Sequence, residues 1–135
     1  DLGLSRNRLL AGDEVTINVT ATRECWIYLY DLWLDWGKTS LIAPNDRVPE
    51  IHLKAGQTWE YPDENARKAG VSKLVAELPE GYKVSAETVR VIASRTPLPP
   101  KVTDPAEGFL AVLRRMNAAR VDWAEDAQAF TIYEK

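Results

Sequence analysis

The chain has 135 residues, of which 45% are hydrophobic and 27% charged, and its formal net charge is −3. This length and composition suit one globular domain, and the weak negative charge argues against nucleic acid as a partner, since phosphate binding depends on clustered Lys and Arg. No apolar run approaches the roughly 20 residues of a membrane-spanning helix, so we expect no membrane insertion. The sequence opens without Met, and we interpret residues 1–135 as a single domain excised from a longer protein.

The first part of the chain shows the two-residue period of β-strands. Residues 15–20 alternate apolar and polar side chains, which predicts a strand with one buried face. Residues 25–35 form a longer predicted strand with apolar side chains at both parities, Tyr28 and Tyr30 at one and Ile27 and Leu29 at the other. Such a strand is typical of the centre of a sheet that is covered on each side.

Short strands separated by turn residues follow. Residues 35–37, with Gly37 free to take positive φ, predict a tight hairpin turn into a returning strand at residues 39–43. Residues 63–70 predict one or two helical turns. Further strands are expected over residues 51–54, 58–61, 71–78 and 87–94. The regular spacing favours a mainly β fold, an antiparallel β-sandwich of about seven to nine short strands.

The C-terminal part predicts one helix and one more strand. Residues 97–100 are too proline-rich for either element and should form an extended connector. A helix is predicted over residues 104–119, with Asp104 as its N-cap and Glu107 completing a capping box. Its apolar side chains recur at helical spacing, so we expect the helix to pack on the second sheet face. Residues 128–134 predict the final strand.

The residue types that carry chemistry are sparse. Cys25 is the only cysteine and His52 the only histidine, and alternation with apolar neighbours places His52 on a solvated strand face. Asp31 interrupts an apolar strand, so a buried Asp31 needs partners or a raised pKa. Only a deep polar pocket around Asp31 or His52 would favour an enzyme. We therefore expect no catalytic, cofactor-binding or metal-ligating residues and no bound cofactor.

Five tryptophans are the one compositional excess. Trp26 and Trp123 are predicted to lie in the core. Trp33, Trp36 and Trp59 lie near predicted strand ends or turns, where partly exposed indoles could stack on sugars or anchor a protein partner. The alternative is that their rings fill the ends of the hydrophobic core of the sandwich. These three residues form the candidate binding surface.

Several short motifs occur in a fixed order along the chain. They are Gly12-Asp13-Glu14-Val15, Trp26-Ile27-Tyr28-Leu29, Gly37-Lys38, Leu41-Ile42-Ala43-Pro44-Asn45, Lys54-Ala55-Gly56 and Val89-Arg90-Val91-Ile92-Ala93-Ser94. With them, the chain resembles the domain of unknown function 4384 family over roughly residues 2–100. It departs from the family at Ala43, where Phe is common, and at Trp36, where a small or polar residue is commoner. The resemblance implies a bacterial non-catalytic module, often attached to signal peptides, protein kinases or caspase-like peptidases, and it carries no catalytic residue.

The sequence therefore predicts a non-catalytic accessory or protein-interaction module of a bacterial multidomain envelope or signalling protein. Its partner is expected to be a protein, and its location the envelope or periplasm in preference to the cytoplasm. A carbohydrate-binding module that uses exposed tryptophans is the alternative.

Overall fold

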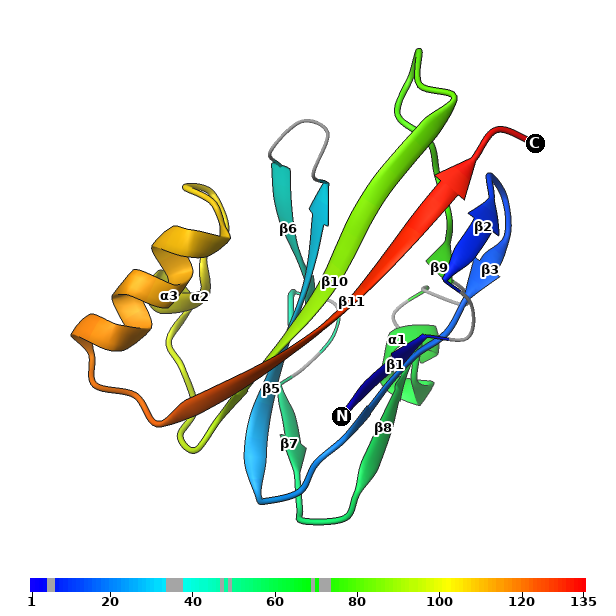
Figure 1. Cartoon of the computed structure of the whole chain (residues 1–135). Helices are drawn as coiled ribbons and strands as arrows, with labels where there is room; N and C mark the ends of the chain where they lie inside the picture. The colour runs from blue at the N-terminus through cyan, green and yellow to red at the C-terminus, as the bar shows by residue number, and fades with distance from the viewer. Residues whose placement is uncertain (5–6, 34–37, 47, 49, 69, 71–73) are drawn as a thin grey trace.

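Figure 1 shows the computed structural model of the chain, which describes all residues except 5–6, 34–37, 47, 49, 69 and 71–73. The strands are β1 (Leu2–Leu4), β2 (Arg8–Leu10), β3 (Glu14–Val15), β4 (Ile17–Thr20), β5 (Cys25–Trp33), β6 (Lys38–Ala43), β7 (Ile51–Leu53), β8 (Thr58–Tyr61), β9 (Leu74–Val75), β10 (Val84–Ser94) and β11 (Trp123–Tyr133). The helices are α1 (Glu64–Lys68), α2 (Pro100–Thr103) and α3 (Phe109–Ala118).

A large sheet and a small sheet form the framework. The large sheet has the order β2-β11-β10-β5-β6, and β7 pairs with the start of β5. All pairs in this sheet are antiparallel except β11 with β2. The small sheet has the order β1-β4-β8, and β3 and β9 form a separate two-stranded sheet. The chain is thus mainly β, as predicted. Its described residues form eleven strands, more than the seven to nine expected, because strands as short as β3 and β9 show no two-residue period in the sequence.

Strand β5 is covered on both faces, as its two-sided apolar pattern predicts. Ile27 and Leu29 belong to a buried cluster that also contains Ile17 and Val19 of the small sheet. The second cluster joins the opposite face of β5 to α2 and α3, and its buried members are Tyr28, Tyr30, Ile92, Leu98, Val102, Phe109, Val112 and Met116. Figure 1 shows α2 and α3 on one side of β5 and β10, and the small sheet together with α1 on the other.

Two buried tyrosines on β5 attach the segment that follows β10. The Tyr30 hydroxyl donates a hydrogen bond to the Thr103 carbonyl at 2.6 Å, and the Tyr28 hydroxyl accepts one from the Leu98 N–H at 2.7 Å. The Phe109 ring also meets the Tyr30 ring edge-on, with centroids 5.2 Å apart. These contacts fix α2 and α3 to the large sheet.

The C-terminal helix begins later than predicted. Pro100, the last residue of the predicted extended connector, begins α2 (Pro100–Thr103), whereas α3 starts only at Phe109 after Gly108 with φ 94°. Asp104 does not cap α3, whose N-cap position is taken by Gly108 four residues later. The Asp104 carboxylate instead accepts the Ala106 N–H within the turn. The capping box was therefore the wrong prediction.

The final strand is longer than the predicted 128–134. β11 begins at Trp123 and pairs with β10 along its whole length, from Trp123 opposite Ser94 to Tyr133 opposite Val84. Its first half contains Ala, Glu and Asp, which have low strand propensity, so pairing with β10 imposes the extended conformation.

Candidate functional site

Asp31 and Trp33, both singled out in the sequence, line one cavity together with Glu87. The cavity of about 510 Å³ lies beside β5, β6, β9 and β10. Asp31 and Glu87 lie on the same sheet face, because Asp31 is opposite Val89 and Glu87 is opposite Trp33. Burial raises the pKa of the Asp31 carboxyl, and a hydrogen bond with Glu87 opposes part of that rise. A hydrogen bond between two carboxyl groups requires a proton on one of them.

This cavity offers limited chemistry. Most other side chains that line it are apolar, such as Ile17 and Phe130. Asp31 and Glu87 are within hydrogen-bond reach, whereas the two carboxyls of a glycosidase lie roughly 5 Å or more apart to admit the sugar. Among the described residues, no three His, Cys, Asp or Glu side chains gather in a way that could hold a metal ion.

His52 lies elsewhere, on the outer side of β7. Its exposed ring stacks on Trp26 with centroids 4.2 Å apart, and its Nε2 lies 3.5 Å from a Glu24 carboxylate oxygen. The indole N–H of Trp26 donates to Glu50 at 3.0 Å. His52 is therefore a surface histidine in a polar cluster and does not meet Asp31.

The three tryptophans of the candidate binding surface are not equivalent. Trp59 is only 8% exposed, and its indole N–H donates to Asp63 at 2.7 Å, so the prediction that it is exposed was wrong. Pairing of β8 with β4 turns Trp59 inward opposite Val19. Trp33 is half-buried in the wall of the cavity, with Lys38 Nζ 5.6 Å from its ring centroid. Trp36 lies outside the described residues.

Trp123 and Trp26, expected in the core, are half-buried at the margin of the second cluster. Cys25 is buried, and burial raises the pKa of its thiol. Among the described residues, none of the helices is long and apolar enough to cross a membrane.

The first half of β11 pairs with no strand on the side away from β10, although β1 lies beside it and the Leu2 N–H donates to Asp126. β10 pairs with all of β11, but β2 pairs only with Thr131–Tyr133. The hydrogen bonds between Arg95 N–H and Asp122 O and between Glu134 N–H and Lys83 O show that even-numbered residues bond toward β10. The odd-numbered residues of β11 therefore direct N–H and C=O away from β10, as Thr131 does when it donates to Asn7 O.

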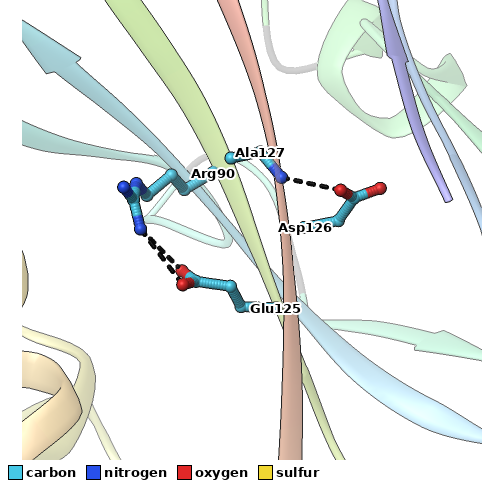
Figure 2. A network of polar contacts seen from close by, with 4 residues as sticks. All are labelled: Arg90, Glu125, Asp126 and Ala127. Carbon is cyan, nitrogen blue, oxygen red and sulfur yellow. Dashed lines mark hydrogen bonds and ion pairs between the residues drawn. The ribbon is translucent and has the colours of Figure 1, made fainter.

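One of these outward donors is already occupied. The Ala127 N–H donates to Oδ1 of the neighbouring Asp126 at 2.9 Å, and Oδ2 of the same carboxylate accepts the Leu2 N–H at 2.8 Å. Figure 2 shows Asp126 reaching to the Ala127 nitrogen on one side of β11, while Glu125 meets Arg90 on the other. Within the described part of the chain, no hydrogen bond fills the outward N–H of Glu125 or Ala129. We call Trp123–Ala129 the β11 edge.

A groove of about 300 Å³ lies beside the β11 edge, on the side of Ala124 and Asp126. Its apolar lining comes from β4, β5 and β10 and the residue after β4, namely Val19, Ala21, Cys25, Ile27, Val91 and Ala93. Arg23, Arg95 and Asp122, all exposed, also line it. The groove thus lies next to unpaired backbone groups, and most of its apolar lining is buried.

Sequence reasoning missed this edge. Ala124, Ala127 and Ala129 carry no chemistry, and the predicted last strand began only at residue 128. A weak signal exists in the small, exposed side chains that follow Trp123, but only the pairing with β10 shows that they form an edge.

Comparison with known proteins bears on the scaffold. Neither the curated proteins nor the solved structures gave a match. Residues 8–97 match the family described as Domain of unknown function (DUF4384), a range that starts at β2 and ends after β10. This agrees with the motif order found in the sequence, and the match leaves α2, α3 and β11 outside. Because the match covers most of the chain, the protein belongs to the DUF4384 family.

Proposed function

We propose that the domain is a non-catalytic protein-interaction module that adds an extended segment of its partner to the β11 edge. The observation that carries the proposal is the row of outward backbone groups at Glu125 and Ala129, which pair with no other strand among the described residues. Exposed edges of this kind are templates for strand addition.

The energetics favour a modest affinity that depends on sequence. Glu125 and Ala129 offer up to four backbone hydrogen bonds, and each contributes a net of about 1 kcal/mol. Ordering a flexible segment opposes much of this gain. Side-chain contacts with the adjacent groove must therefore supply the remaining free energy and the specificity.

The proposal also covers the parent protein, its location and the arrangement of the two sheets. We infer a bacterial multidomain envelope or signalling protein as the parent, an envelope or periplasmic location, and no nucleic-acid partner. We also infer that the two sheets form an antiparallel sandwich within a single domain of residues 1–135, supported by the buried cluster that the two sheets share.

The proposal is tested with a display library of random linear peptides selected on the folded chain. Ala129→Pro removes an outward N–H without touching the ladder to β10, and a proline is tolerated at such a position. Ala129→Thr keeps the N–H and serves as the matched control. We expect selected peptides to bind the unmodified chain and Ala129→Thr alike, and to bind Ala129→Pro at least several-fold more weakly. Failure to select any peptide, or equal binding to Ala129→Pro, contradicts the proposal.

A further inference from the structure

We propose that β6 pairs along its outer edge with the β6 of a second copy of this chain, antiparallel and with the two Ser40 residues opposite each other. This inference goes beyond the proposed function, because it concerns the other end of the large sheet and a different partner. Three observations carry it: the outward backbone groups of β6, the open side of the strand, and a register in which its sequence complements itself.

Two residues of β6 direct their backbone groups away from β5. The hydrogen bonds between β10 and β11 involve odd-numbered β10 residues such as Arg95, so the even-numbered ones bond to β5. In the β5–β10 register, the even-numbered β5 residues therefore bond to β10 and the odd-numbered ones to β6. Asp31 lies opposite Ser40, so Ser40 bonds inward to β5. Its neighbours Thr39 and Leu41 consequently direct N–H and C=O outward.

The outer side of β6 is open over these residues. β6 ends the strand order of the large sheet, and of the described elements only β5 runs extensively alongside it. Within the described part of the chain, no hydrogen bond reaches the outward N–H of Thr39 or Leu41. The open stretch stops after Leu41, where the register shifts and the Asn45 side-chain amide donates to the Ile42 carbonyl at 2.7 Å.

The sequence of β6 complements itself in the antiparallel direction. With Ser40 on a two-fold axis, Thr39 of each copy lies opposite Leu41 of the other, and only this register pairs the two outward residues with each other. The two Ser40 hydroxyls meet at the centre, where they can hydrogen-bond across the strands. Lys38 lies opposite Ile42 of the other copy, so the pairing brings no like charges face to face.

A second copy suits this edge better than a flexible segment does. Two outward residues offer few hydrogen bonds, and ordering a flexible segment opposes most of their contribution. A second β6 is already held extended by β5, so it forms the same bonds with little further loss of conformational entropy. Lysine often guards sheet edges, but Lys38 Nζ lies 5.6 Å from the Trp33 ring centroid and so reaches back over β5. The two-fold pairing uses both edges and therefore closes at a dimer.

The register is tested by cysteine trapping of the whole chain under mild oxidation. Opposed residues of a non-hydrogen-bonded antiparallel pair have Cα atoms about 4.5 Å apart, a separation that a disulfide spans. We therefore expect Ser40→Cys to form a covalent dimer. Thr39→Cys is the matched control, because its counterpart lies two positions out of register, beyond the roughly 7 Å limit for a disulfide, and it should stay monomeric. The native Cys25 is buried and common to both variants.

The backbone pairing is tested by sedimentation velocity over a concentration series. Thr39→Pro removes an outward N–H and leaves the ladder to β5 intact, whereas Thr39→Val keeps that N–H. We expect the unmodified chain and Thr39→Val to dimerise alike, and Thr39→Pro to dimerise about tenfold or more weakly, since each dimer loses two hydrogen bonds. If Thr39→Pro does not fold, the contrast between the two cysteine variants decides alone.

Three results would overturn the inference. A chain that stays monomeric, with no cross-link through Ser40→Cys, has no such pairing. A dimer that Thr39→Pro leaves intact uses another surface, and equal cross-linking of Ser40→Cys and Thr39→Cys shows another register. The proposed function fails separately, because Ala129→Pro lies at the opposite end of the large sheet and should leave dimerisation unchanged.

Discussion

Replacing Tyr30 by Phe should destabilise the fold by a predictable amount. The Tyr30 side chain is fully buried, and its hydroxyl donates to the Thr103 carbonyl at 2.6 Å. The substitution keeps the ring and its edge-on contact with Phe109 but leaves the buried carbonyl without this donor. Loss of such a bond costs about 1–3 kcal/mol, which for a chain of this size corresponds to a fall in Tm of roughly 3–6 °C per kcal/mol.

The assay is urea-induced unfolding followed by tryptophan fluorescence, with thermal unfolding as a second reading. Tyr133→Phe is the matched control, because the exposed Tyr133 hydroxyl accepts only a 3.5 Å hydrogen bond from Arg8. We expect the control to stay within about 0.5 kcal/mol of the unmodified chain. If Tyr30→Phe also stays within that range, the hydroxyl does not hold α2 on the sheet, and the account of how the C-terminal segment is attached fails.

Two further substitutions test the interior. Burial raises the pKa of Asp31 above its ordinary 3.8, so the folded chain keeps a proton that the unfolded chain has lost, and the free energy of unfolding should fall as pH rises above 3.8 through the folded pKa. Asp31→Asn should weaken this fall and stabilise the chain near neutral pH, which urea titrations at several pH values measure, and parallel curves for the two chains would argue against a buried carboxyl pair. Met116→Ala empties a fully buried site beneath α3 and should cost about 2–5 kcal/mol, whereas the exposed Leu110→Ala on the same helix should cost far less. Equal losses for these two would show that α3 does not pack as described.

The interior of the fold could be predicted because its pattern is repeated and local. The two-sided apolar run from residue 25 correctly indicated a central strand, and the apolar spacing of Phe109, Val112 and Met116 correctly indicated a helix on a sheet face. The start of α3 could not be predicted from capping residues. Asp104 and Glu107 have the right spacing, but residues 104–108 form a turn in which the Asp104 carboxylate accepts the Ala106 N–H, and the helix begins only after Gly108.

The candidate site was less predictable because it depends on pairing between distant segments. Asp31 stood out as a polar break in an apolar strand, but its partner Glu87 is 56 positions away in the sequence and meets it only through the β5–β10 register. Trp59 was assigned to the surface because it lies near turn residues, whereas the β4–β8 register turns it inward. The contact of Asp31 with Glu87 depends on pairing between distant strands, whereas the alternation along Thr58–Tyr61 is a local signal that indicates the inward position of Trp59.

The β11 edge lies outside the residues that match the DUF4384 family. The match ends at residue 97, and β11 begins at Trp123. Family membership therefore accounts for the scaffold that β10 and β5 provide, while the proposed binding edge is a feature of the segment that follows the match.

Amide hydrogen exchange along β11, resolved by residue, tests the central claim most directly. In the free chain, the N–H groups of Ala124 and Gln128, bonded to β10, should exchange slowly, and those of Glu125 and Ala129 should exchange fast. Addition of a peptide selected on the chain should slow Glu125 and Ala129. Slow exchange at these two residues in the free chain, or unchanged fast exchange with the peptide bound, would contradict strand addition at this edge.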